Sequence, residues 1–140
     1  MPQSTTPEAA MHENLAILSR FDVRDVKGSA DVLADDVVWH FFNPQVPALH
    51  GDHKGIEALA AFFAALAELT AGSFTVNVVD ARPVGEELVV VQTRNTLTLD
   101  GRDLATDVVV VWRIVDGKIA EVWDIPSLHT LAAPNPAGPG

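Results

Sequence analysis

The stretch TLTLDGRDLATDVVVVWRIVDGKIAEVWDIPS, residues 96–127, carries the strongest strand signal of this chain. Its β-branched and aromatic runs are interrupted twice by an Asp-Gly pair, which is typical of strands joined by tight turns. With the similar composition upstream, the pattern predicts four consecutive strands, at residues 73–81, 87–98, 102–114 and 118–125. Consecutive strands joined by short turns pair antiparallel, so an antiparallel sheet is expected.

The chain before residue 73 carries mostly helical spacing. Apolar residues recur at helical intervals in GIEALAAFFAALAELTAG, residues 55–72, the clearest helix of the chain. The other expected elements are helices at residues 9–20 and 24–34, a strand at residues 36–42 and a loop at residues 43–55. This order predicts an α+β domain in which one curved antiparallel sheet wraps around its helices.

Composition limits the possible functions. The 140 residues, 48% of them hydrophobic, suit one domain at residues 9–128 between a flexible tail at 1–8 and a disordered tail at 129–140. A net charge of −10 argues against binding to nucleic acid or anionic lipid. The chain has no cysteine, no recognisable signal peptide and no apolar run of membrane-spanning length, so we expect a cytoplasmic protein.

Two segments carry a resemblance to a known family. LADDVVWHFF…LHGDHKGIEALAAFFAALAELTAGSF and DGKIAEVWDIPS resemble the nuclear transport factor 2-like superfamily, and the second is similar to its SnoaL-like, polyketide cyclase-like branch. The resemblance covers about residues 10–128. It implies a cystatin-like cone, in which helices close a mostly apolar pocket, and commonly a dimer formed through the outer face of the sheet. The superfamily includes isomerases, dehydratases, hydrolases, cyclases and non-enzymes, so the fold alone assigns no activity.

The two Asp-Gly turns decide which side chains face that pocket. If LDG and VDG are three-residue loops, Thr98 faces Arg102 and Ile114 faces Lys118. One sheet face then holds Gln92, Arg94, Thr106, Val108, Val110, Trp112, Val122 and Asp124. The other holds Thr93, Asp107, Val109, Val111, Arg113, Glu121 and Trp123. Two-residue loops would flip these partners; the resemblance, which puts Asp124 in the pocket, favours three residues.

Asp124 is the candidate proton-transfer residue. The resemblance implies this role, since SnoaL-like cyclases use the matching Asp to enolise a carbon acid. Apolar neighbours would raise the pKa of such a carboxyl toward neutral pH, and Val108, Val110, Trp112 and Val122 are the expected wall. The alternative is a hydrated, idle carboxylate at the end of a strand.

Arg94 is the expected partner of Asp124, because a cation on the inner face needs a counter-charge. The pair also resembles limonene epoxide hydrolases, in which Arg bridges two Asp residues, but Asp107 falls on the opposite face. The alternative is a surface pair of Arg94 with Asp107. Ketosteroid isomerase chemistry is not expected, since Phe41 and Val110 stand where that branch carries its carboxylates.

Other residues complete the expected pocket. Trp39, Phe41, Phe63 and Gln92 are candidate walls, and His50 and His53 are candidates for its mouth, as is His129. A metal bound by His50, Asp52 and His53 is the weaker interpretation of that loop, so neither metal nor cofactor is expected. The apolar outer face, with Val109, Val111 and Trp123, predicts a homodimer.

These observations favour cofactor-free acid/base chemistry on a small, apolar, carbonyl-bearing ligand, with Asp124 and Arg94 as the catalytic pair. The alternatives are a non-catalytic ligand-binding protein, a dimerisation module and an epoxide-hydrolase-like enzyme.

Overall fold

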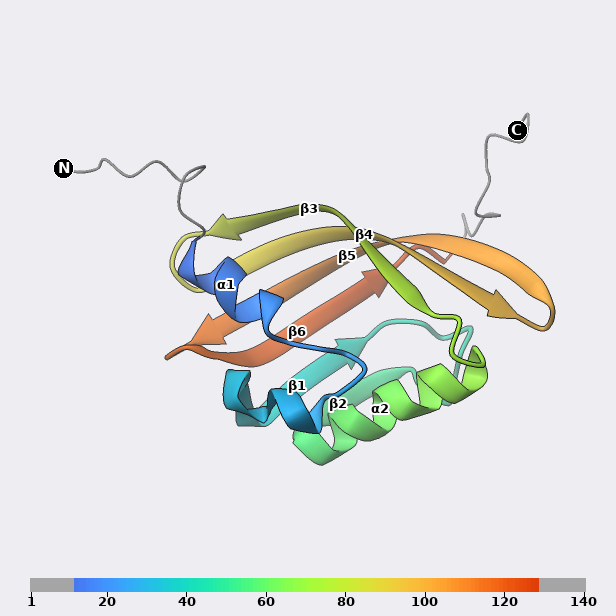
Figure 1. Cartoon of the computed structure of the whole chain (residues 1–140), viewed down its shortest axis with the longest axis horizontal. Coiled ribbons are helices and arrows are strands. Elements are labelled where there is room, and N and C mark those ends of the chain that lie inside the picture. Colours follow the sequence, from blue (N-terminus) through green and yellow to red (C-terminus); the bar gives the residue numbers. More distant parts are fainter. Residues whose placement is uncertain (1–11, 129–140) are drawn as a thin grey trace.

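The computed structural model describes residues 12–128; the predicted tails at 1–8 and 129–140, and with them His129, lie outside the described residues. One six-stranded sheet, in the order β2-β1-β6-β5-β4-β3, forms the body of the protein (Figure 1). In chain order the elements are α1 (Glu13–Ser19), the 3₁₀ helix η1 (Lys27–Val32), β1 (Leu33–Phe41), β2 (Gly51–Lys54), α2 (Ile56–Leu69), β3 (Thr75–Val84), β4 (Leu88–Leu99), β5 (Arg102–Val115) and β6 (Lys118–Pro126). The predicted α+β class is confirmed.

The sheet is mixed, although an antiparallel sheet was predicted. β1 runs parallel to β6, with Trp39 beside Val122 and Phe41 beside Asp124. β2 lies in the segment predicted as a loop and pairs antiparallel with β1 at the edge of the sheet. Its sequence, GDHK, is too short and polar to show a strand pattern.

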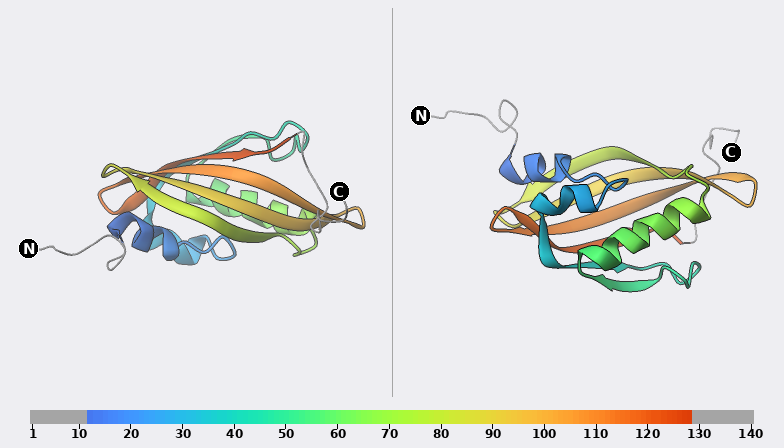
Figure 2. Two further views of the ribbon diagram at one scale, coloured as in Figure 1. Left: turned by 90° about the horizontal axis from the view of Figure 1, so that it is seen from above. Right: turned by 60° about the horizontal axis from the view of Figure 1, so that its bottom comes forward.

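The helices lie across one face of the sheet (Figure 2, right). α2 agrees with the prediction and contacts β1, β2 and η1, whereas α1 contacts β3, β4 and β6. The predicted helix at residues 24–34 is wrong: only the short η1 turn forms, and β1 begins directly at Leu33. Gly28 and Ser29 in its middle are weak helix formers, and the β-branched run that follows favours a strand.

Both hairpin loops have two residues, so the three-residue prediction is wrong. Asp100 and Gly101 have φ of 53° and 77°, and Asp116 and Gly117 repeat these values. Two consecutive left-handed residues are typical of the type I′ turn, which matches the twist of paired strands.

In the β4–β5 hairpin the shorter loop exchanges the two faces. Arg94 stands opposite Asp107 and Gln92 opposite Val109, on the face away from the helices. Thr93 and Asn95 therefore face the helices, the reverse of the prediction.

In the β5–β6 hairpin an irregularity cancels the effect of the shorter loop. Ile114 pairs with Ile119, but Arg113 pairs with Glu121, so Ala120 is an extra residue in β6. This bulge restores the alternation, and Val110 stands opposite Asp124. Asp124 thus faces the helices as expected, but through a turn and a bulge rather than through a longer loop.

The core lies between the helices and this inner face. Its aromatic centre consists of Phe21, Trp39, Phe62, Phe63 and Trp112, whose rings meet mainly edge to face. Around them pack Val37, Leu59, Val89, Ile119 and Val122, none of which exposes measurable surface. The packed centre of the inner face is therefore apolar.

Candidate functional site

Asp124 lies on β6 among apolar neighbours. Its strand places it between Val110 of β5 and Phe41 of β1. The Trp39 indole Nε1–H donates a hydrogen bond of 3.2 Å to Asp124 Oδ2. Burial raises the pKa of the Asp124 carboxyl to about 7, and the hydrogen bond from Trp39 opposes this rise without cancelling it. At neutral pH the group can therefore either release or accept a proton.

Asp124 opens into a cavity of about 700 Å³ between α1, Phe63 of α2 and strands β3 to β6. The wall is mostly apolar and aromatic, and is formed chiefly by Leu15, Leu18, Phe21, Val23, Trp39, Phe63, Phe74, Val76, Val78, Ala81, Val91, Val110 and Trp112. Asp124 is partly accessible to water, and it is one of the residues that line this cavity. Asp22 is the other acidic lining residue, and its side chain is exposed.

Two buried polar lining residues missed by sequence analysis lie on β4. Thr93 and Asn95 are only 3% and 8% exposed. Thr93 Oγ1 and Asn95 Oδ1 have no hydrogen-bond partner within residues 12–128, and the same holds for Nε1 of Trp112, which also lines the cavity. The type of turn in the β4–β5 hairpin was the signal that could have placed Thr93 and Asn95 inside.

Arg94 lies on the opposite face of the sheet, which corrects its predicted place beside Asp124. Its Nη1 donates to Asp107 Oδ1 at 2.9 Å in a half-exposed ion pair. Gln92, predicted as pocket wall, is exposed on the same outer face. Both corrections follow from the two-residue turn. The same turn produces the surface pair of Arg94 with Asp107, which was the alternative prediction from the sequence.

The two predicted loop histidines do not line the cavity. Nδ1 of the exposed His50 accepts a hydrogen bond from the Asn43 backbone N–H at 3.1 Å. His53 Nε2 donates to the Leu49 carbonyl at 2.7 Å, and its ring packs against Phe62 with centroids 4.6 Å apart. These contacts shape the loop before β2. In the part of the chain that the structure describes, no three His, Asp or Glu side chains are grouped as metal ligands.

The remaining predicted wall residues divide into two groups. Trp39, Phe63, Val110 and Trp112 line the cavity together with Asp124. Phe41, Val108 and Val122 are buried on the inner face but belong to the packed core and not to the cavity lining. The inner face of the sheet is therefore packed at Phe41, Val108 and Val122 and lines the cavity at Trp39, Val110 and Trp112.

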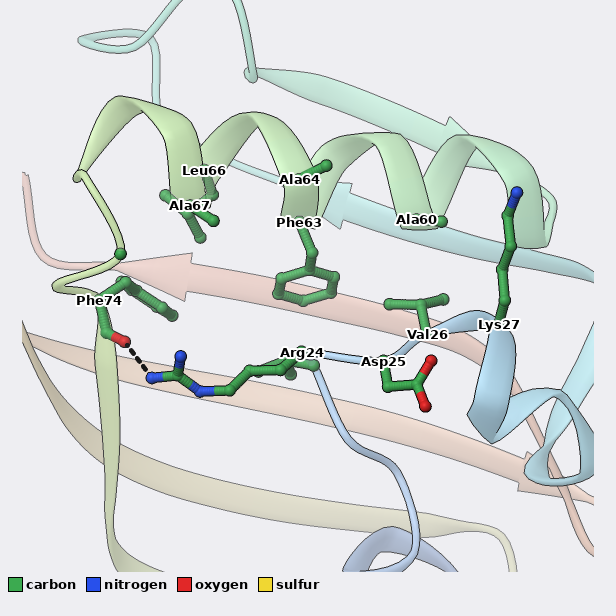
Figure 3. A pocket seen from close by; sticks show the side chains of 12 residues that line it. Arg24, Asp25, Val26, Lys27, Ala60, Phe63, Ala64, Leu66, Ala67 and Phe74 are labelled. Atoms are coloured by element: carbon green, nitrogen blue, oxygen red, sulfur yellow. Dashed lines mark hydrogen bonds between the residues drawn. The ribbon is translucent and has the colours of Figure 1, made fainter.

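A second hollow of about 410 Å³ lies between α2 and the segment before η1 (Figure 3). Phe63 points from α2 toward this segment and contributes to both hollows, as do Val23 and Phe74. The cations here are already engaged: Arg24 donates to the Phe74 carbonyl at 3.2 Å, and Lys27 pairs with Glu57 at 3.2 Å. The larger cavity, which holds Asp124, is the better candidate site.

Comparison with known families identifies the chain. The model of the SnoaL-like domain matches residues 15–122, which include nearly all of the sheet. The protein belongs to the SnoaL-like domain family. The resemblance inferred from the sequence is therefore confirmed, and the arrangement is the α+β fold also described as cystatin-like. No functionally curated protein matches the chain.

Solved structures of the same fold cover most of this SnoaL-like chain. An NTF2-like protein of unknown function from Burkholderia pseudomallei K96243 is 25% identical over 81% of this chain and 90% of its own, with a TM-score of 0.72. TerC, co-crystallised with polyporic acid, is 25% identical over 82% and 88%, with a TM-score of 0.68. A putative SnoaL-like polyketide cyclase from Jannaschia sp. CCS1 is 21% identical over 82% and 85%, with a TM-score of 0.68.

The SnoaL-like domain has no helix, within residues 12–128, of the length and apolar character needed to cross a membrane.

Proposed function

We propose that this SnoaL-like protein catalyses proton transfer at carbon, without a cofactor, on an apolar carbonyl-bearing compound held in the larger cavity. The observation that carries the proposal is the Asp124 carboxyl, whose pKa burial raises to about 7, at the wall of that cavity. A general base is most effective when its pKa lies near the working pH.

The contacts of Asp124 suggest how the proton moves. Trp39 holds Oδ2, whereas Oδ1 receives no hydrogen bond from the described residues. Oδ1 would take the proton from the carbon next to a carbonyl, and the C–H electron pair would pass into the carbonyl as an enolate. The protonated carboxyl then returns the proton to another carbon, or to the alkoxide formed when the enolate attacks a second carbonyl.

The charge of the cavity narrows the substrate class. No Lys or Arg is among the residues that line it within the described chain. A developing enolate would therefore rely on neutral donors and on its own delocalisation, because burying an unpaired anion is costly. Compounds whose C–H is flanked by two carbonyls, or by a carbonyl and an aromatic ring, meet this condition.

The same geometry gives less support to an epoxide-hydrolase-like activity. In the limonene epoxide hydrolases, which the predicted pair of Asp124 and Arg94 resembles, an Arg bridges two carboxylates that face the pocket. Here Arg94 and Asp107 both lie on the outer face of the sheet. TerC, which has the same fold, was co-crystallised with polyporic acid, and this supports the proposal that the SnoaL-like domain binds a small compound.

Hydrogen–deuterium exchange at carbon tests the proposal without knowledge of the natural substrate. A suitable probe is 2-tetralone, a bicyclic ketone with a C–H between its carbonyl and its aromatic ring. In D₂O, the wild-type protein is expected to accelerate exchange at this position, and Asp124→Asn to abolish the acceleration. Asp107→Asn, which removes a carboxylate from the outer face, is the matched control and should exchange like the wild type.

The outcomes separate catalysis from binding. Exchange at the wild-type rate in Asp124→Asn would contradict the assignment. Binding of the probe, with no acceleration by the wild-type protein, would favour the non-catalytic ligand-binding alternative.

We also propose that two copies of the chain associate through the outer face of the sheet. Val109 and Ile125 are 42% and 46% exposed there. Trp123 is half-buried under the His40 ring, with the Arg113 guanidinium 5.3 Å from its own ring centre. These apolar residues share the face with polar ones such as Gln92 and Arg94, and apolar residues within a polar rim are a common subunit contact.

Sedimentation velocity tests the association. The wild type is expected to sediment at twice the chain mass of 15.0 kDa, and Val109→Asp as a monomer. Leu69→Asp, at a similarly exposed apolar residue on α2, on the helical side of the sheet, is the control. A monomeric wild type would contradict the proposal.

A further inference from the structure

The inner face of β4 carries a polar pair that the proposed proton transfer does not use. Thr93 and Asn95 are two residues apart, so both side chains face the cavity that they line. Their exposed fractions are 3% and 8%. Thr93 Oγ1 and Asn95 Oδ1 lack a hydrogen-bond partner among residues 12–128.

Such groups are unfavourable in the folded protein by itself. A buried polar atom without a partner costs about 1–3 kcal/mol, and apolar residues of the same shape would fit this wall without that cost. Polar groups that break the rule of satisfied burial are typical of functional sites, where a bound molecule supplies the missing partner. Both residues line the cavity, so a ligand bound there would lie next to their side chains.

The register places this pair away from Asp124. Asp124 on β6 pairs with Val110 on β5, and Val110 pairs with Val91 on β4. Thr93 and Asn95 come after Val91 on the same face of β4. From standard strand spacing and rise, the Cα atoms of Asp124 and Thr93 are about 12 Å apart, and those of Asp124 and Asn95 about 16 Å apart. The cavity wall between them is apolar, with Val91 and Val110.

We propose that Thr93 and Asn95 form a specificity subsite for a hydroxyl or carbonyl group at the far end of an elongated substrate. The end that reacts lies at Asp124, and an apolar body spans the wall that contains Val91 and Val110. Thr93 can donate and accept, and the Asn95 amide offers both functions, so the pair suits a phenol, an enol or a ketone oxygen. The inference deepens the proposed function and rests on it only for the role of the end at Asp124.

Binding of two aromatic probes that cannot undergo turnover tests the subsite. The probes are 2-naphthol, with one hydroxyl, and 2,6-dihydroxynaphthalene, which adds a second hydroxyl at the opposite end. Quenching of the fluorescence of Trp39 and Trp112, which line the cavity, reports binding. The wild-type protein is expected to bind the diol about 3- to 10-fold more tightly, the effect of one net neutral hydrogen bond.

Variants assign the preference to the pair. In Thr93→Val with Asn95→Leu, the ratio of the two dissociation constants is expected to fall to about one. Thr96→Val, at a threonine on the opposite face of the same strand, should keep the wild-type ratio. Asp124→Asn should alter the affinity for both probes but retain the ratio, so loss of proton exchange and loss of the subsite are separate results.

Stability provides a second readout. Thr93→Val replaces an unpartnered hydroxyl by a methyl group of the same size, so its melting temperature should equal or exceed that of the wild type. If Asn95→Leu does not fold, Thr93→Val alone should lower the preference for the diol.

The proposal is overturned if the wild type shows no preference for the diol. This is the result expected if ordered water alone satisfies Thr93 and Asn95. It is also overturned if the double variant keeps the preference, or if Thr93→Val lowers the melting temperature, which would indicate a structural hydrogen bond.

Discussion

Replacing Asp124 by Asn should make the protein more stable, by an amount that depends on pH. Burial raises the pKa of Asp124 from 3.8 to about 7 in the folded state. The folded protein therefore binds a proton more tightly than the unfolded chain does. The ionised carboxyl destabilises the fold, and this effect is absent below pH 3.8, grows as the pH rises toward 7 and is complete above it.

The rise in pKa sets the magnitude. At about 1.4 kcal/mol per pH unit, the full penalty above pH 7 is about 4 kcal/mol, and somewhat more than a third of it is already present at pH 5. The asparagine side chain introduced at this position carries no charge at any pH, although its amide must find hydrogen bonds of its own. The free energy of unfolding of Asp124→Asn minus that of the wild type should thus increase by about 2–3 kcal/mol between pH 5 and pH 8.5.

Urea denaturation followed by Trp fluorescence at several pH values measures this difference. Comparing the two proteins at each pH removes the contributions of the other ionisable groups that they share. Asp107→Asn, which removes the same charge from the solvent-exposed outer face, is the control and should change stability by less than about 1 kcal/mol. A difference that is constant with pH, or that shrinks as the pH rises, would refute the view that Asp124 is desolvated.

Three further predictions concern the outer face and the turns. Both ring nitrogens of His40 lie 2.7 Å from a carboxylate, Nδ1 from Asp52 and Nε2 from Glu121. Burial lowers the pKa of His40, but the hydrogen bonds to Glu121 and Asp52 outweigh this effect and raise the pKa above 6.5. The stabilisation by protonated His40 is complete below pH 6.5 and is lost as the pH rises through the raised pKa. In urea titrations, His40→Gln should therefore cost more unfolding free energy at pH 6 than at pH 9, and an equal cost at both pH values would contradict this. Arg94→Gln should leave proton exchange unchanged and cost at most about 1 kcal/mol of unfolding free energy, since the ion pair of Arg94 is half-exposed; a loss of exchange would place it in the site. Gly117→Ala should cost about 1–2 kcal/mol because its φ is +77° although no atom crowds the position, and an unchanged melting temperature would show that the turn adapts.

Much of the fold could be predicted from local patterns. The helical spacing of residues 55–72 and the Asp-Gly pairs between β-branched runs identified α2 and the chain of hairpins. These signals are strong because neighbours in the sequence are also neighbours in the structure. The parallel pairing of β1 with β6 joins segments about 85 residues apart and has no such signal, as the bond from Trp39 to Asp124 illustrates.

The candidate site was predictable only in part, because the side chains of a strand alternate between faces. Thr93 and Arg94 are neighbours in the chain, yet one lines the cavity and the other pairs with Asp107 outside. One residue more or less in the Asp100–Gly101 turn exchanges them.

The α+β class, the SnoaL-like resemblance and the presence of an Asp near the end of the last strand could all be inferred from local sequence patterns. The direction in which that Asp and its neighbours point depends on long-range packing. Asp-Gly fits both a two-residue and a three-residue loop, so the turn sequence leaves open which side chains of each hairpin share a sheet face. Packing of the inner face settles it, through a bulge at Ala120 that turns Asp124 toward the cavity and a regular β4–β5 ladder that turns Arg94 away.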